Sequence, residues 1–152
     1  MSRAALFLIL PVVLACAKKD EPAAGTTGAA STEVVSAPAG MNLAGRWSVR
    51  VMPEDRDTTV IMYVLEATNT NTGWKMTLPN RNPMDIRVIH MDSDSIVVEN
   101  GPYSSALQRG VMVSTHSNVH LEGDKLVGRT LAHYQVNGPD SLRVFRTEGV
   151  RQ

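Results

Sequence analysis

The sequence has little of several features on which small proteins can depend. Its 152 residues include a single cysteine, so an intramolecular disulfide is excluded. The 15 basic and 15 acidic residues cancel, and residues 41–152 alone are also neutral by count, so bulk charge favours no nucleic-acid partner. No apolar run reaches the roughly 20 residues that a membrane-spanning helix needs. The fold must therefore depend on its own core.

The sequence also lacks the motifs of common enzymes. It contains no Gly-x-Ser-x-Gly elbow and no Gly-rich phosphate loop, and a Ser-His-Asp triad is defined by geometry rather than by residue counts. On a strand, His116 and His120 would stand about 13 Å apart at roughly 3.3 Å per residue, too far to share a metal ion. His116 and His133 are nearer but have no evident third ligand. We therefore expect no catalytic residue, no cofactor and no metal site.

The single cysteine, Cys16, follows a short apolar run from Ala4 to Leu14. This run is too short to cross a membrane and is typical of a signal h-region. The small Ala15 in front of the cysteine resembles the signal of bacterial lipoproteins, in which the cysteine becomes the lipid-modified first residue of the mature protein. The alternative is an ordinary secretory signal with an incidental cysteine.

The lipoprotein resemblance implies a signal peptide at 1–15 and acyl chains such as palmitate on Cys16, enough for stable membrane anchoring. Ala17, where inner-membrane retention uses Asp, implies the outer membrane, with the domain facing the periplasm or the cell exterior. Residues 16–40 are rich in Ala, Gly, Ser, Thr and Pro and bury too little apolar area to offset ordering, so we expect a disordered linker. The folded domain is then 41–152.

Within 41–152 no window has the helical period of 3.6. About eight strand-like runs, separated by clusters of Gly, Pro, Asn and Asp, are present instead. They cover roughly 44–52, 58–68, 73–79, 85–92, 94–99, 110–122, 125–136 and 141–151. The pattern predicts an all-β fold.

One hairpin can be predicted residue by residue. Gly123-Asp124 is a two-residue turn with Gly first, and it sets Glu122 opposite Lys125. The next inward pairs are Leu121 with Leu126, Val119 with Gly128, Ser117 with Thr130, Thr115 with Ala132 and Val113 with Tyr134. The other face carries His116, His120 and His133 and should face water.

The predicted loops alternate in length along the chain. Those at 53–57, 80–84, 100–109 and 137–140 have four to ten residues, and those at 69–72, 93 and 123–124 have one to four. In an antiparallel up-and-down meander alternate loops lie at opposite ends, so one end would be tightly closed and the other open. A closed barrel of about eight strands has this layout and can enclose side chains or one small ligand.

Gly45-Arg46-Trp47, at the start of the first run, resembles the Gly-x-Trp motif of lipocalins and related calycin barrels. The resemblance implies a lipocalin-like barrel whose closed end is sealed by an Arg from the last strand lying across the Trp. Arg151 is at the correct position for this role, and Arg146 is the next choice. The alternative is a β-sandwich in which Trp47 is ordinary core.

The lumen of such a barrel is the candidate binding site. Its expected lining residues are Trp74, Thr115, Ser117, Thr130 and Tyr134, and the expected residues of the open-end loops are Arg81, Tyr103 and Arg109. Small hydroxyl side chains leave room that either Trp47 and Trp74 or a small apolar or amphipathic ligand fills. A cavity above about 300 Å³ favours a ligand-binding module. A packed lumen with an apolar loop patch favours an envelope interaction protein.

Overall fold

A computed structural model describes residues 33–152, which form one compact unit. The predicted signal peptide, Cys16 and most of the predicted linker lie outside the described residues. Within the described part of the chain, no helix has the length and apolar character needed to cross a membrane.

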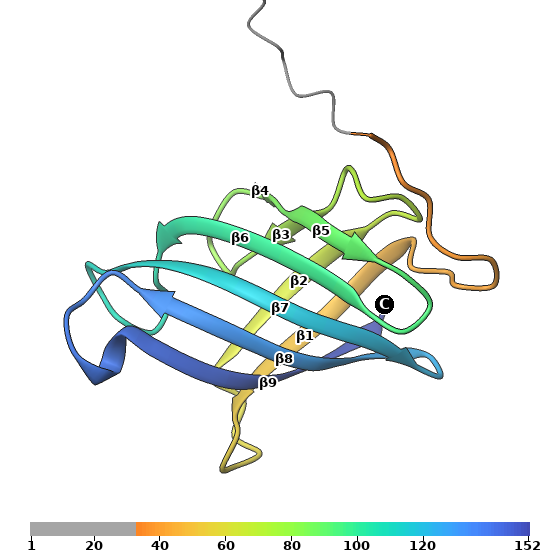
Figure 1. The fold of residues 1–152 in the computed structure, drawn as a ribbon. Coiled ribbons are helices and arrows are strands. Elements are labelled where there is room, and N and C mark those ends of the chain that lie inside the picture. The colour runs from red at the N-terminus through yellow and green to blue at the C-terminus, as the bar shows by residue number, and fades with distance from the viewer. Residues whose placement is uncertain (1–32) are drawn as a thin grey trace, which may run out of the picture. The chain divides into compact units, whose positions relative to one another are not determined.

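Nine antiparallel strands form a single sheet (Figure 1). They are β1 (Gly45–Pro53), β2 (Ile61–Ala67), β3 (Lys75–Thr77), β4 (Met84–Asp85), β5 (Arg87–Met91), β6 (Ile96–Ser104), β7 (Met112–Glu122), β8 (Lys125–Tyr134) and β9 (Leu142–Arg151). A short 3-10 helix, η1 (Pro139–Ser141), precedes β9. The prediction of an all-β, antiparallel up-and-down barrel is confirmed.

The first and last strands of the chain, β1 and β9, pair with each other in the middle of the curved sheet. The order is β4-β3-β2-β1-β9-β8-β7-β6-β5, and the β1–β9 ladder runs from the pair Trp47 and Arg151 to the pair Pro53 and Phe145. The two edge strands, β4 and β5, are consecutive in the chain and separated only by Ile86, whose amide donates to the Trp74 carbonyl at 2.9 Å. The barrel is therefore nearly closed. The sequence predicted one strand at 85–92, but the chain there pairs first with β3 and then with β6.

The β7–β8 hairpin has the predicted register in every pair, from Glu122 opposite Lys125 to Val113 opposite Tyr134. Ser117, Thr130 and Ala132 on its inner face are buried. His116 and His133 on its outer face are exposed, and His120 is partly exposed. The two-residue turn sets this register. A slip by one residue is disfavoured, because it would turn all the inward-facing side chains of one strand to the outer face.

The loops alternate between the two ends as predicted. One end, here called the closed end, carries the connections 68–74, 92–95 and 123–124 together with both ends of the described chain, near the C-terminus marked in Figure 1. The other, the open end, carries 54–60, 78–83, 105–111 and 135–141.

Residues 33–40 differ from their prediction as linker, because they lie against the loop 68–74 at the closed end. The Ala37 amide donates to the Asn69 carbonyl at 2.7 Å, and the Asn71 amide donates to the Val35 carbonyl at 2.8 Å. The Asn69 side chain also accepts from the Leu43 amide at 2.7 Å. Residues 33–40 therefore belong to the compact unit Glu33–Gln152.

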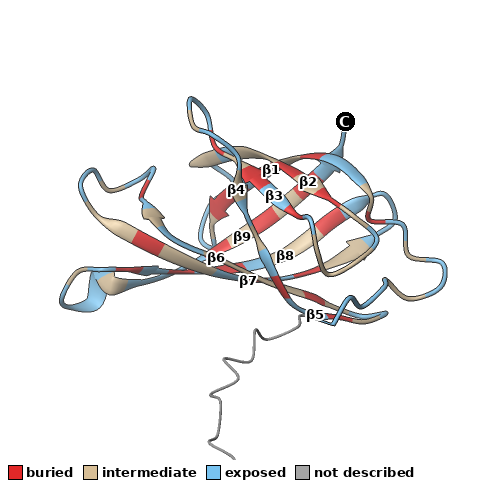
Figure 2. Ribbon diagram, turned by 90° about the horizontal axis from the view of Figure 1, so that it is seen from above, coloured by how far each residue is buried: buried red, intermediate tan, exposed pale blue. Residues whose placement is uncertain are grey.

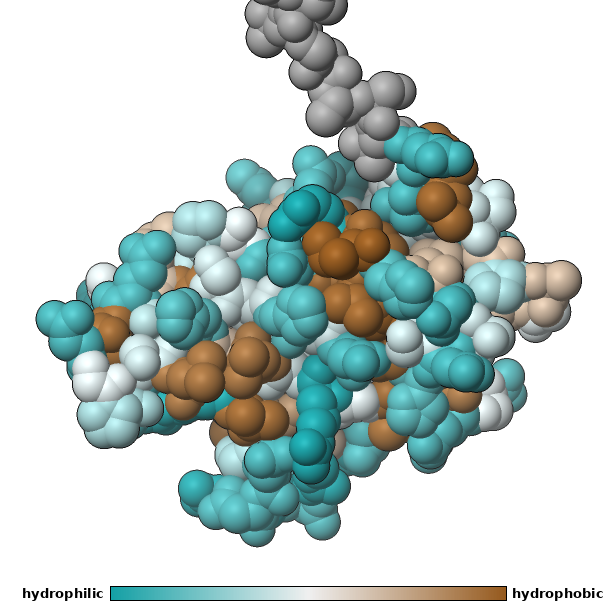
Figure 3. Space-filling view, viewed as in Figure 1, coloured by the Kyte–Doolittle hydropathy of each residue, from teal (hydrophilic) through white to brown (hydrophobic). Residues whose placement is uncertain are grey.

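Burial alternates along the strands, so one face of the sheet lines the lumen and the other meets solvent (Figure 2). On the outer face, apolar groups are interrupted by hydrophilic side chains (Figure 3). Inside, the buried apolar residues divide into two clusters. The closed-end cluster includes Leu43, Trp47 and Trp74, and the open-end cluster includes Tyr134 and Phe145.

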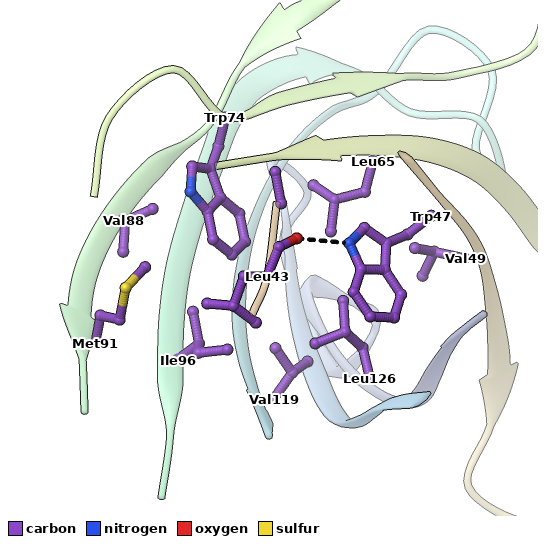
Figure 4. Close-up of a cluster of buried hydrophobic side chains, with 11 residues drawn as sticks. Leu43, Trp47, Val49, Leu65, Trp74, Val88, Met91, Ile96, Val119 and Leu126 are labelled. Atoms are coloured by element: carbon purple, nitrogen blue, oxygen red, sulfur yellow. Dashed lines mark hydrogen bonds between the residues drawn. The ribbon is translucent and has the colours of Figure 1, made fainter. Parts of the chain in front are cut away.

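Two tryptophans fill the closed end of the lumen. Trp47 is 0% exposed and Trp74 is 1% exposed, and Leu43 lies between them (Figure 4). The Trp47 indole donates to the Leu43 carbonyl at 2.9 Å. Arg151 lies over the Trp47 ring, 4.3 Å from its centroid, and donates to the carbonyls of Asn42, at 2.6 Å, and Ala44. This is the Trp–Arg contact that the lipocalin resemblance implied.

Gly45 leaves room for that guanidinium. Its φ is 138°, and a Cβ at this position would lie 2.8 Å from Arg151 Nη1. Glycine is therefore the residue that both the backbone conformation and the close approach of Arg151 require.

We predict that Trp47→Ala lowers the free energy of unfolding by about 3–5 kcal/mol, because it removes a fully buried ring and the contact with Arg151. Urea denaturation followed by circular dichroism measures the loss. Met62→Ala on β2, where the side chain is largely exposed, is the control and should change stability by less than about 0.5 kcal/mol. A loss under about 1 kcal/mol for Trp47→Ala would contradict its place in the core.

Candidate functional site

A cavity of about 40 Å³ lies in the open half of the lumen. Its aromatic lining is Tyr63, Tyr103, Tyr134 and Phe145, and its hydroxyl lining is Ser105, Thr115, Ser117 and Thr130. Aliphatic and other small residues complete the wall: Val51, Ile61, Met76, Leu78, Ala106, Val113 and Ala132. None of these side chains carries a charge. The cavity is large enough for a few water molecules, at about 10–15 Å³ each, and smaller than the 300 Å³ or so of a typical ligand site.

All three tyrosines of the chain contribute to this cavity. Burial raises the pKa of Tyr63, and the neighbouring Tyr103 adds to the rise. Burial also raises the pKa of Tyr103 and of Tyr134. The three phenols therefore stay neutral at physiological pH and offer hydrogen bonds without charge.

A layer of buried hydroxyl groups forms the floor of the cavity. Ser117 Oγ lies 2.8 Å from Thr130 Oγ1, which lies 2.7 Å from Thr147 Oγ1. The three residues come from the adjacent strands β7, β8 and β9. Ser117 is directly opposite Thr130, whereas Thr147 is diagonal to Thr130, so the hydrogen-bonded row of hydroxyl groups slants across the sheet. Each hydroxyl in the row has a partner, so the burial of these polar groups is compensated.

The loop 105–111 covers the mouth of the cavity and is held mainly by its own hydrogen bonds. Ser105 Oγ accepts from the amides of Leu107, at 3.0 Å, and Gln108, at 2.9 Å. The Ser105 amide donates to the Val111 carbonyl at 2.8 Å. Arg81, from the neighbouring loop 78–83, donates to the Ser104 and Ser105 carbonyls, the second at 3.4 Å.

The structure brings most of the predicted lumen residues together. Thr115, Ser117, Thr130 and Tyr134 all line the cavity. Trp74 does not, because β3 starts at the closed end and Trp74 packs there in the other cluster. Of the residues expected in the open-end loops, Tyr103 belongs to β6 and faces the cavity, Arg81 lies at its rim and Arg109 is exposed in the loop 105–111.

Sequence reasoning missed Tyr63, Phe145 and Thr147. Each faces inward on β2 or β9, two positions along from another inward residue: Tyr63 precedes Leu65, and Phe145 precedes Thr147. Period-two alternation could have found them once β2 and β9 were placed on either side of β1.

The histidines lie on the outer face, mostly beside carboxylates. His116 Nδ1 is 3.3 Å from Glu99 Oε1, His120 Nε2 is 2.9 Å from Glu122 Oε1, and His90 Nε2 is 2.6 Å from Asp92 Oδ2. The hydrogen bond from His90 lowers the pKa of Asp92 to about 2. Over residues 33–152, no three His, Cys, Asp or Glu side chains are grouped closely enough to hold a metal ion.

Comparison with protein-family models, with curated proteins and with solved structures found no match. The fold is a nearly closed antiparallel barrel of nine strands, which is consistent with a calycin-like barrel.

We predict that Thr130→Val destabilises the domain by about 1–3 kcal/mol, because it removes the shared partner of the Ser117 and Thr147 hydroxyls at constant shape. Denaturant titration measures the change. The triple variant Ser117→Ala, Thr130→Val and Thr147→Val should recover part of the loss, since no buried hydroxyl is then left unpaired. A triple variant as unstable as the sum of its single changes would show that the row is not coupled.

Proposed function

We propose that this protein is a lipid-anchored, lipocalin-like binding module of the bacterial cell envelope, and that it holds a small amphipathic molecule in the open half of its barrel. The observation that carries the proposal is the uncharged cavity, with apolar walls and serine and threonine hydroxyl groups from β7, β8 and the loop 105–111. Ligand sites have this composition, because apolar walls supply affinity and a few polar groups fix orientation.

The ligand requires more space than the present 40 Å³. Under the proposal, the loop 105–111 moves away from the mouth to admit it. The loop is suited to moving as a unit, because its hydrogen bonds join Ser105 to Leu107, Gln108 and Val111 within the loop itself. Lids of this kind are commonly surface loops with few contacts to the core.

The proposed anchor acts from the end opposite the mouth. The described chain begins at Glu33 against the loop 68–74, at the closed end. A tether fixed at Cys16 would therefore join the barrel domain at the end of the chain that lies on the closed end, not at the mouth.

A second candidate is an interaction protein of the envelope whose barrel is filled by its own side chains. The small cavity favours it, and so do three exposed apolar residues on the outer wall of β8 and β9: Leu131 (37% exposed), Leu142 (49%) and Val144 (39%). Leu131 and Val144 are directly paired. On the face seen in Figure 3, apolar side chains gather in small groups with hydrophilic side chains between the groups. Larger contiguous patches mark protein interfaces more strongly than small ones do.

We predict that Ser117→Trp weakens the binding of the neutral fluorescent probe phenylnaphthylamine by at least about tenfold, equivalent to about 1.4 kcal/mol, because the indole occupies the cavity. Fluorescence titration of the purified complete chain measures the affinity. Ala132→Leu fills the same space more gently and should also weaken binding, which keeps the test valid if the larger side chain impairs folding.

Asn118→Trp is the matched control, because it makes the same addition one residue further along β7, where the side chain is exposed. It should leave the probe affinity within about twofold, as should the joint change of His116, His120 and His133 to Gln. Equal affinities in Ser117→Trp and Asn118→Trp would mean that the probe does not enter the lumen and would favour the interaction protein.

We predict that Cys16→Ser abolishes labelling of the protein by a radioactive or clickable fatty acid in the producing bacterium and leaves the signal peptide attached. Lipoprotein processing requires the thiol, which accepts the lipid before cleavage. Acyl labelling and the mass of the intact protein provide the readout. A cleaved but unlabelled wild-type protein would instead indicate an ordinary secretory signal.

A further inference from the structure

The carboxylates of the open-end loops are all neutralised by arginines. Four ion pairs account for them: Glu54 with Arg129 at 3.1 Å, Asp55 with Arg56 at 3.3 Å, Asp140 with Arg143 at 2.9 Å, and Asp57 with Arg146. Within residues 33–152, Arg81 and Arg109 are the arginines of these loops that have no carboxylate partner. Each exposed ion pair contributes little to the stability of the domain. Because the four pairs neutralise the carboxylates, Arg81 and Arg109 leave the rim of the mouth with a surplus of positive charge.

Arg81 is the one of these two arginines that lies at the cavity. A turn closed by a 3.1 Å hydrogen bond from the Arg81 amide to the Leu78 carbonyl places it there, and Leu78 lines the cavity. Its guanidinium donates to the carbonyls of Ser104 and Ser105, and Ser105 also lines the cavity. Arg81 is also close to Tyr103, since its charge opposes the rise in the pKa of Tyr103 caused by burial. A full cation is thus held at the rim by neutral acceptors alone.

The lumen below the rim cannot accept a charged group cheaply. Its wall contains no charged side chain, and an unpaired ion taken from water into such surroundings loses its hydration without compensation. An amphipathic ligand must therefore leave its polar end at the mouth, where the surplus charge is positive.

We propose that the ligand of the barrel carries one anionic group, a carboxylate, sulfonate or phosphate, and that this group replaces the Ser104 and Ser105 carbonyls as the acceptor of Arg81. An anion forms hydrogen bonds to a guanidinium that are roughly twice as strong as those of neutral acceptors, and it can bind both nitrogens together. The exchange detaches Arg81 from the start of the loop 105–111, so the ligand itself releases the cover of its site. The inference rests on the proposed binding function.

The test uses two dyes with the same aromatic body, neutral phenylnaphthylamine and anionic anilinonaphthalene sulfonate, titrated into the complete chain. In Arg81→Gln the anionic dye should bind at least about tenfold more weakly, the value of one charge-assisted hydrogen bond. The neutral dye should bind equally well or more tightly, because Arg81 no longer holds the start of the loop 105–111 over the cavity. A loss of folding would weaken the binding of both dyes alike. A loss of affinity for the anionic dye alone therefore shows that Arg81 recognises the anion.

Arg56→Gln is the matched control, since it removes one positive charge from the same end of the barrel but from a residue already paired with Asp55. It should leave both affinities within about twofold. Arg81→Lys retains the charge but not the two-pronged geometry, so it should show an intermediate loss for the anionic dye. Wild-type affinity for the anionic dye should also fall as sodium chloride is added, while that for the neutral dye should not.

Three results would overturn the inference. Equal weakening of both dyes in Arg81→Gln would mean that Arg81 serves the fold only. An unchanged affinity for the anionic dye would mean that the anion binds elsewhere. If neither dye binds the wild-type chain, the proposed function itself fails, and the inference fails with it.

Discussion

The pairing of β1 with β9 is the constraint on which the rest of the domain depends. The first and last strands of the chain pair with each other from Trp47 and Arg151 onward, and they thereby join β2–β4 and β5–β8 into one sheet whose edge strands are β4 and β5. The sheet curves into a nearly closed barrel, which limits the exposure of strand edges. The pairing gives the curved sheet a lumen. It also brings Arg151, near the end of β9, over Trp47, near the start of β1, so this contact at the closed end depends on the pairing of β1 with β9.

Closure leaves a lumen that is filled unequally along its length. The closed half contains both tryptophans and Leu43, whereas the open half contains Ser117, Thr130 and other small residues among its aromatic rings. The row of hydroxyl groups separates the two halves. Interiors are normally packed to near crystal density, so the residual space coincides with the small side chains that the sequence places there. An inert barrel would gain stability from larger ones.

The sequence predicted much of the fold because alternation and turn chemistry are local. The β7–β8 register followed from Gly123-Asp124 alone, and the loop ends followed from counting strands. Asn69 and Asn71 accept hydrogen bonds from the amides of Leu43 and Val35, contacts that an apolar pattern does not reveal. The split near Ile86 also escaped prediction, because alternation identifies a strand but not which neighbour it pairs with.

The site was predicted less completely than the fold, because the sequence does not show how deep in the barrel each inward-facing residue lies. Alternation identifies which residues face inward, but it does not tell how far each lies from the mouth. Trp74 was placed correctly on the inner face and incorrectly beside the cavity, although counting strands assigns the start of β3 to the closed end. Ser105 could not be predicted, since it enters the cavity wall from a loop, where alternation gives no guide to which side chains face inward.

At both ends of the barrel an arginine side chain holds a chain segment across the opening, but the segment at the closed end is held more firmly. At each end a guanidinium bridges two nearby carbonyls and holds a segment across the opening: Arg151 holds residues 42–44, and Arg81 holds residues 104–105. The first segment inserts Leu43, which is 0% exposed, and Arg151 also stacks on Trp47. At the open end, the loop that starts with Ser105 contributes the small residues Ser105 and Ala106 to the cavity wall, and Val111 packs against the open-end cluster while only partly buried. Uncovering the closed end would expose a leucine worth about 1.5–3 kcal/mol of apolar burial in addition to the stacking contact, whereas uncovering the open end exposes little. The open end is therefore the one that can open at low cost.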